Sequence, residues 1–194
     1  MNDLDLETVE RAQEGDENAC RVILERLHRP VIATIYRFLG SRFSNEVEDI
    51  AQDVFLKVFR ALDRFDPERG VKFTTWVYTF VRNHCYDMLK KRRLVTSSLS
   101  AAGEDQAPRE LPDETAPSPT RAVESLELGR QIEAALLALG EDQRMAFVLR
   151  EYEGLEYGAI AQVMGVSEGT VKSRLHRAKE SLRNRLAPYL RTGS

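Results

Sequence analysis

Four side chains near the C-terminus could together read the edges of DNA bases. They are Lys172, Ser173, His176 and Arg177. Because they recur at helical spacing, a helix that begins at about Ser167 would carry all of them on its outer face. Lys and Arg pair with the guanine acceptors of the major groove, and the Ser hydroxyl can bind either donors or acceptors on the bases. This patch therefore has the chemistry of direct base readout.

Three further cations lie on the flanks of the same predicted helix: Arg174, Lys179 and Arg183. They would point sideways toward the phosphates of bound DNA, where they add affinity and salt dependence without sequence specificity. The alternative interpretation is a helical hairpin with a merely basic surface.

A helix-turn-helix is the element that would position this patch. Gly165 would supply a left-handed turn, Ala161 would let the two helices approach, and Ser167 would cap the second helix. The second helix has an apolar stripe made of Val171, Leu175, Ala178, Leu182 and Leu186. Because the glycine, the cap, the stripe and the donor patch agree, the sequence favours a DNA-reading helix-turn-helix over the plain hairpin.

A second candidate nucleic-acid face lies on a long helix predicted over about residues 74–93. One side of that helix is a core stripe of Val77, Val81, Cys85 and Met88. The other side carries Thr79, Arg82, Asn83, Tyr86, Lys90 and Arg93. Cations can follow a phosphate backbone and an exposed ring can stack on bases at roughly 1–3 kcal/mol per base, so this side suits single-stranded nucleic acid.

Four aromatic residues at the start of that helix favour a different interpretation. They are Phe73, Trp76, Tyr78 and Phe80. Large rings so close together are more often packed in a core than held ready for a ligand, so we expect core packing for them.

Helical periodicity dominates the 194 residues, and the expected fold is all-α, with two small helical domains joined by a flexible linker. The predicted domains are residues 1–94 and 121–194. Residues 95–120 are rich in Pro, Ser, Ala and acids, with few apolar residues large enough to bury, which is typical of a linker.

The first domain allows more detailed predictions. Pro30 is expected to interrupt a helix that ends near Gly40, and Ser44 or Asn45 would cap the next one. That next helix buries a broad apolar face. Its opposite side would expose Asp49, Gln52, Asp53 and Lys57 to water or to a partner.

The net charge of −3 hides two local basic patches, residues 90–93 and the segment after Gly169. Together they suggest a polyanionic partner touched at two places, with solvated helix faces as the alternative for either patch alone. No apolar run is long enough to span a bilayer, so we expect a cytoplasmic protein with no membrane segment. Cys20 and Cys85 lie far apart and are expected to be reduced thiols.

Nothing in the sequence argues for an enzyme, a metal site or another cofactor. Asp49 and Asp53 could bind a divalent cation, but no third acid or histidine converges on them in sequence. His28, His84 and His176 are scattered, and His84 has neither a plausible partner nor zinc-ligand spacing. The sequence also lacks a glycine-rich phosphate loop and a nucleophile motif.

Three stretches resemble the extracytoplasmic-function group of bacterial sigma factors, and the resemblance covers nearly the whole chain. They are residues 49–62, residues 73–83 and residues 169–178. The resemblance implies a promoter-specificity subunit that directs transcription initiation at a specific set of promoters in response to stress or another signal. The implied partners are core RNA polymerase, through the clamp helices of its largest subunit and the flap of the second, promoter DNA and an anti-sigma factor.

The resemblance also implies a role for each stretch. The first would bind the clamp helices through Asp49, Gln52, Asp53, Phe55 and Phe59. The second would melt the minus-10 element, where Asn83 and the loop before Phe73 would hold a flipped base. The third would read the minus-35 element through the patch that contains Lys172 and Arg177. The chain departs from the family at two places, Gly140 where proline is usual and Ala159 where glutamate is common.

Two other functions fit parts of the sequence. A free-standing repressor or activator could use the same helix-turn-helix, but it leaves the side of Arg82, Asn83 and Tyr86 unexplained. A protein that sequesters another helical factor would use no DNA, and the donor patch between Lys172 and Arg177 argues against it.

Overall fold

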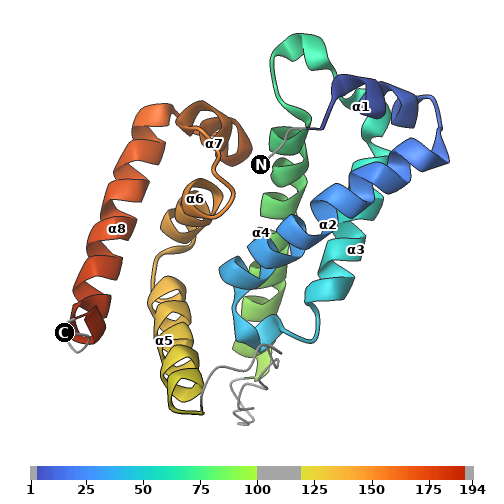
Figure 1. Ribbon diagram of the computed structural model, residues 1–194. Coiled ribbons are helices and arrows are strands. Elements are labelled where there is room, and N and C mark those ends of the chain that lie inside the picture. Colours follow the sequence, from blue (N-terminus) through green and yellow to red (C-terminus); the bar gives the residue numbers. More distant parts are fainter. Residues whose placement is uncertain (1–3, 100–118, 191–194) are drawn as a thin grey trace.

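The computed structural model describes residues 4–99 and 119–190, and within these ranges every regular element is a helix, as predicted (Figure 1). The N-terminal domain contains α1 (Leu6–Gln13), α2 (Glu17–Leu39), α3 (Val47–Arg60) and α4 (Phe73–Leu99). Short 3-10 helices join them: η1 (Ser41–Phe43), η2 (Leu62–Arg64) and η3 (Pro67–Arg69). The C-terminal domain contains α5 (Pro119–Leu137), α6 (Glu141–Glu151), α7 (Tyr157–Met164) and α8 (Glu168–Leu190).

Helix α4 is longer than its predicted span of 74–93. It continues to Leu99, into the segment predicted to be linker, and α5 begins at Pro119, just before the predicted end of that linker. The remainder of the predicted linker, residues 100–118, lies outside the described residues.

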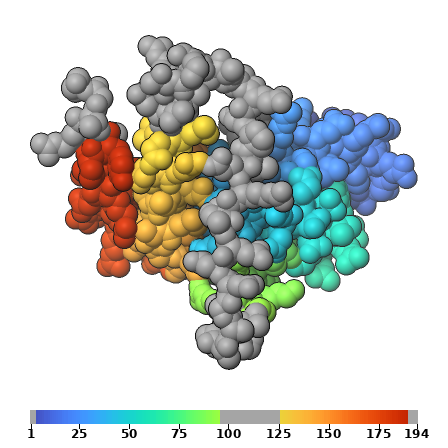
Figure 2. All heavy atoms as spheres, turned by 90° about the horizontal axis from the view of Figure 1, so that it is seen from below, coloured from blue at the N-terminus to red at the C-terminus, as the bar shows by residue number. Residues whose placement is uncertain are grey.

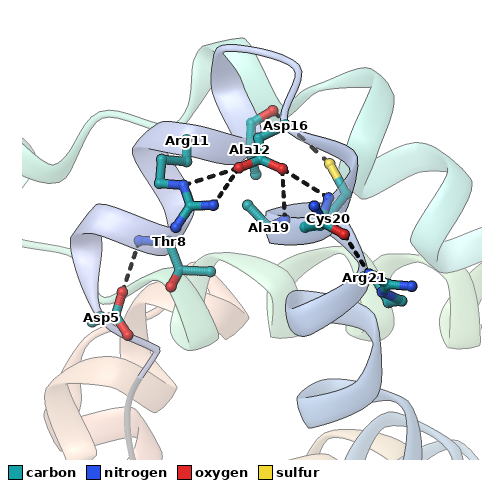
Figure 3. Close-up of polar contacts among 9 residues, drawn as sticks. Asp5, Thr8, Arg11, Ala12, Asp16, Ala19, Cys20 and Arg21 are labelled. Atoms are coloured by element: carbon teal, nitrogen blue, oxygen red, sulfur yellow. Dashed lines mark hydrogen bonds and ion pairs between the residues drawn. The ribbon is translucent and has the colours of Figure 1, made fainter.

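Side-chain caps fix the starts of α1 and α2 (Figure 3). The carboxylate of Asp5 accepts the backbone N–H of Thr8 at 2.7 Å. Asp16 accepts the N–H of Ala19 at 3.3 Å and pairs with the guanidinium of Arg11 at 2.5 Å. Each acid satisfies N–H groups at a helix start that lack an intrahelical partner, and each lies at the positive end of the helix dipole.

Helix α2 runs without a break through Pro30, so the prediction that this residue interrupts the helix is wrong. Proline removes one backbone hydrogen bond and strains the preceding turn, at about 3 kcal/mol in a helix interior. The residues on either side nevertheless form one buried stripe, including Ile23, Leu27, Val31 and Ile35. Burial of several such side chains, at roughly 1.5–3 kcal/mol each, outweighs the cost of one proline.

The start of α3 also differs from the prediction. Residues 41–43 form a 3-10 turn, and the N-cap position falls on Glu46, whose side chain makes no capping hydrogen bond. Neither Ser44 nor Asn45 is therefore the cap. The predicted capping box is absent because the preceding 3-10 turn shifts the first residue of the helix to Val47.

The helix-turn-helix is confirmed in its details. Gly165 ends α7 in the left-handed conformation with φ 65°, and the Oγ of Ser167 accepts the N–H of Thr170 at 3.2 Å. The apolar stripe of α8 is buried at Val171, Leu175 and Ala178. These contacts fix the start of α8 relative to α7.

The two domains pack against each other. Helices α6 and α7 lie against α2 and α4, and α5 contacts α2 (Figure 1). In the space-filling view the yellow and orange helices of the C-terminal domain touch the blue α2 (Figure 2). One cluster of buried apolar residues extends through both domains, from Ile23 and Val81 to Leu149 and Val171.

Candidate nucleic-acid interface

The donor patch on α8 lies on the surface, as predicted. Lys172, Ser173, His176 and Arg177 are all exposed. The hydroxyl of Ser173 donates to the backbone carbonyl of Thr170 at 2.9 Å, which leaves its oxygen free to accept. The helix-turn-helix therefore presents four side chains with different hydrogen-bonding abilities on one rigid surface.

Two of the flanking cations form ion pairs with acids of the same domain, and only Arg174 is largely covered by its pair. Arg174 forms an ion pair with Asp142, and only 21% of its side chain is exposed. The ammonium of Lys179 lies 2.8 Å from a carboxylate oxygen of Glu151. The expectation that Arg174 points to the flank is therefore wrong for this conformation, because Asp142 provides a nearer anion.

The face of α4 is partly formed as predicted. Asn83, Lys90 and Arg93 are exposed, and the guanidinium of Arg82 donates to the side-chain oxygen of Asn83 at 2.8 Å. The same guanidinium lies 4.6 Å from the ring centre of Tyr86. These contacts hold the amide of Asn83 in one orientation at the surface.

Tyr86 is half-buried, so the prediction of an exposed stacking ring is wrong for this conformation. Its ring stacks on Phe38 with 5.4 Å between ring centres, and its hydroxyl donates to Oδ1 of Asp142 at 2.7 Å. Burial, reinforced by the hydrogen bond to Asp142, raises the pKa of Tyr86 well above its ordinary value.

The upstream aromatic residues pack largely as predicted. Phe73 and Tyr78 are buried, and Trp76 is partly buried against Phe65, Phe73 and Phe80. The ring centres of Trp76 and Phe80 are 4.7 Å apart in an edge-on arrangement. This cluster fixes the start of α4 and the loop before it.

The exposed side of α3 carries the predicted acidic and amide residues. Asp49, Gln52 and Asp53 are exposed, and Leu56 continues the same stripe with 53% of its surface exposed. Phe55 is buried, with 4% exposed, so in this conformation it supports the surface from beneath. Phe59 is half-buried and lies 6.3 Å from Phe55, measured between ring centres.

His84 does have a partner, contrary to the prediction. The ammonium of Lys57 lies 2.6 Å from its Nδ1, and a carboxylate oxygen of Asp53 lies 3.8 Å from its Nε2. The packing of α3 on α4 thus brings His84 close to Asp53, a proximity that the sequence does not predict. Within the described ranges, no three His, Cys, Asp or Glu side chains are arranged to hold a metal ion, and no helix is long and apolar enough to cross a membrane.

An open cleft of about 1280 Å³ lies between the two candidate faces, on α4 and α8. Its lining includes six arginines from both domains: Arg42, Arg92, Arg93, Arg144, Arg174 and Arg177. Two acids, Glu141 and Asp142, also line it. The two basic patches found in the sequence thus meet at one cleft.

Three acidic residues of this interface were missed by the sequence analysis: Glu141, Asp142 and Glu153. Glu141 and Asp142 occupy the first turn of α6, where the helix dipole alone favours acids. Their presence in the sequence therefore did not indicate a contact with the other domain. Glu153 lies in the connection after α6, yet only 5% of its side chain is exposed. Its partners come from helices more than seventy residues earlier in the chain.

The sequence matches two family descriptions, Sigma-70 region 2 over residues 23–95 and Sigma-70 region 4 over residues 129–182. The RNA polymerase sigma-H factor of Pseudomonas aeruginosa is 34% identical over 189 residues, which is 96% of either chain. The ECF RNA polymerase sigma-E factor of Escherichia coli is 33% identical over 185 residues, which is 94% of either chain.

Two solved structures share the fold. The sigma factor RpoE in complex with the anti-sigma factor NepR from Bartonella quintana has a TM-score of 0.69 and 25% identity, covering 86% of this chain and 96% of that one. CnrH in complex with the cytosolic domain of CnrY has a TM-score of 0.66 and 23% identity, covering 96% of this chain and 97% of that one.

Proposed function

Because the chain belongs to the extracytoplasmic-function group of bacterial sigma factors, it is a promoter-specificity subunit of RNA polymerase, and we propose that three of its surfaces divide this task. Members of this family are transcription initiation factors rather than enzymes. The chain acts with core RNA polymerase and promoter DNA, and by its family it responds to stress or another signal. The three surfaces lie on α8, α4 and α3.

The surface of α8 reads the minus-35 element. Lys172, Ser173, His176 and Arg177 contact base edges in the major groove, because all four are exposed on one side of a helix fixed by the turn at Gly165. Arg174 adds a phosphate contact once it leaves Asp142. The exposed donor patch on this helix is the observation that carries the proposal.

The surface of α4 binds the opened minus-10 strand. Asn83, held by Arg82, offers its amide to an unstacked base, and Lys90 and Arg93 follow the backbone. Tyr86 can stack on a base only after its hydroxyl leaves Asp142 and its ring becomes accessible.

The surface of α3 binds the polymerase. Gln52 and Asp53 follow Asp49 by three and four residues, and Leu56 follows Asp53 by three, so all four lie along one exposed stripe with Phe59 at its end and Phe55 beneath it. An acidic stripe with an apolar residue fits the clamp helices of the largest polymerase subunit, and the C-terminal domain would bind the flap of the second. Because the chain acts with RNA polymerase, the proposal includes a cytoplasmic location. An anti-sigma factor would hold the chain there until a signal arrives.

The rival functions account for less of the molecule. A free-standing repressor needs the helix-turn-helix alone, whereas the match to sigma-70 region 2 extends over residues 23–95. A sequestering protein needs no donor patch, whereas the four side chains that include Arg177 are all presented to solvent.

Run-off transcription with purified core polymerase tests the proposal. The chain should direct transcription from a subset of fragments of a genomic library, and altered minus-35 or minus-10 elements should abolish those transcripts. A chain that binds core polymerase but yields no promoter-dependent transcript from any fragment contradicts the proposal.

A further inference from the structure

Helix α1 has no part in the three surfaces proposed above. It lies before residues 23–95, the range that matches sigma-70 region 2. Its Val9 and Ala12 are buried, and the helix packs on α2 and contacts η2, which lies in the connection between α3 and α4 (Figure 1). One polar side chain at the end of α1, Gln13, binds this connection directly.

The carboxamide of Gln13 binds two backbone carbonyls of the connection. Its Nε2 donates to the carbonyl oxygen of Leu62 at 2.9 Å and to that of Phe65 at 2.8 Å, residues that lie 49 and 52 positions later in the chain. An amide group has two N–H hydrogens, so both donors are used. Leu62 begins η2 and Phe65 follows its last residue, so one side chain binds both ends of this turn.

Gln13 is itself held in a fixed position. It is the last residue of α1, whose start is capped by Asp5, and Arg11 pairs with Asp16 at the start of the next helix. The side chain of Gln13 is half-buried, so its hydrogen bonds are partly shielded from competing water. The end of α1 therefore restrains the backbone of η2.

The connection that Gln13 restrains leads into the helix of the proposed minus-10 surface. Residues 61–72 join α3 to α4. The ring of Phe65 contacts Phe73 and Trp76 in the first turn of α4, with 5.1 and 5.5 Å between ring centres. Gln13 thus holds the backbone of Phe65, and the aromatic cluster holds its ring. With Asn83, this connection is expected to hold the flipped base.

A loop that is ordered before it meets DNA binds a base more tightly than one that must become ordered on binding. Ordering a backbone costs conformational entropy, and a preformed loop has already lost that entropy on folding. A base leaves its stack in the duplex only if its capture offsets the cost of unstacking. A looser connection would therefore weaken base capture, while the minus-35 contacts of α8 would stay as they are.

We propose that Gln13 is a positioning residue for minus-10 recognition. It fixes the connection 61–72 in the conformation that receives the unstacked base, and it acts through Leu62 and Phe65 rather than through a contact with DNA. Helix α1 thereby contributes to promoter recognition from outside the range that matches sigma-70 region 2. The inference rests on the proposed function of the α4 surface and adds a residue to it.

The experiment measures base capture by the complete holoenzyme. Core polymerase with the full chain is bound to a forked fragment of a promoter obtained by run-off transcription, in which the non-template strand of the minus-10 element is unpaired. An abasic site replaces each base of that strand in turn. The ratio of the affinities for the intact and the abasic fragment measures capture. Both affinities come from the same holoenzyme, so a loss of folded chain or of polymerase binding leaves the ratio unchanged.

Two variants of Gln13 and one control are compared. Gln13→Ala removes both donors, and Gln13→Glu keeps the shape of the side chain but has no N–H to donate. Glu10→Ala shortens an exposed side chain of the same helix. At the position where the abasic site matters most, both Gln13 variants should lower the ratio about fivefold, and Glu10→Ala should leave it unchanged. Gln13→Glu also covers the case in which Gln13→Ala fails to fold by circular dichroism.

Failure of the inference can be distinguished from failure of the proposed function. A wild-type ratio in both Gln13 variants overturns the inference, and so does an equal fall of the ratio in Glu10→Ala. A wild-type holoenzyme that binds every abasic fragment as tightly as the intact one contradicts instead the proposed function of the α4 surface.

Discussion

The ammonium of Lys57 lies 2.6 Å from Nδ1 of His84, in the interface between α3 and α4. Since an ammonium can only donate, His84 is neutral and accepts through Nδ1. Burial lowers the pKa of His84 and the charge of Lys57 lowers it further, while Asp53 and Asp87 act in the opposite direction.

This geometry predicts that the chain loses stability in mild acid. The unfolded chain takes up the proton on this histidine at about pH 6.5, whereas the folded chain takes it up only at lower pH. The free energy of unfolding should therefore fall as the pH drops below about 6.5, until the pKa of folded His84 is passed. Urea unfolding at a series of pH values measures this slope. His84→Gln should make the slope shallower, and an unchanged slope in that variant would contradict the assignment.

A substitution at Gly140 should stabilise the C-terminal domain. Gly140 is the N-cap of α6 with φ −58° and ψ 144°, and no side chain caps this helix. A Cβ there would meet only Cδ of Gln143 at 3.9 Å. Gly140→Ser should raise the free energy of unfolding by about 1 kcal/mol, from a less flexible unfolded chain and a new cap. Urea unfolding followed by circular dichroism gives the value.

Gly165→Ser is the matched control for that prediction. Gly165 also has room for a side chain, with no atom within 4 Å of an added Cβ, but its φ is 65°. The left-handed conformation costs a non-glycine residue about 1–2 kcal/mol, so this variant should be destabilised. Equal changes at the two glycines would show that backbone conformation is not the cause.

The two thiols should differ in reactivity. Cys85 is fully buried, and burial raises the pKa of its thiol. A reagent therefore cannot reach the sulfur, and the thiol does not ionise to the reactive thiolate. Cys20 is partly exposed, with its Sγ 3.9 Å from the carbonyl oxygen of Ala12 (Figure 3). A maleimide should therefore modify Cys20 in the folded chain and Cys85 only in denaturant, as peptide mapping by mass spectrometry can test. Equal labelling of both in the folded chain would be the opposite result.

The sequence predicts what a few neighbouring residues determine. The turn at Gly165, the cap at Ser167 and the buried side of Cys85 all follow from local periodicity, because each depends on contacts within one or two helical turns. The burial of Tyr86 could not be predicted in this way. Its covering residue, Phe38, and its acceptor, Asp142, come from distant helices.

On the exposed surface of α3, too, helical spacing predicts the polar residues but not which apolar residue is buried. Helical spacing places Asp49, Gln52 and Asp53 on one side correctly, since polarity alone separates them from the core. It does not distinguish Phe55 from Leu56, because both are apolar and adjacent, and only the packing of α3 on its neighbours buries the first and exposes the second.

The stripe on α3 predicts which substitutions weaken polymerase binding. Asp49→Ala and Leu56→Ala should each reduce the affinity for core polymerase about tenfold, because each removes an exposed contact without a cavity in the core. Asp63→Ala removes another exposed acid, outside the stripe, and should leave the affinity unchanged. Fluorescence anisotropy of the labelled chain with core polymerase measures all three. Equal losses in the three variants would point to net charge rather than to a defined surface.

Arg177 and Lys90 should affect different steps of promoter recognition. Arg177 is exposed on the donor patch of α8, so Arg177→Ala removes a base contact and should reduce discrimination at the minus-35 element by about 10–100-fold. Lys90 is exposed on α4, so Lys90→Ala removes a backbone contact to the opened strand. It should weaken strand opening while the minus-35 footprint stays intact. Footprinting with permanganate and nuclease on the polymerase complex separates the two effects, and identical footprints for both variants would contradict the division of labour between α8 and α4.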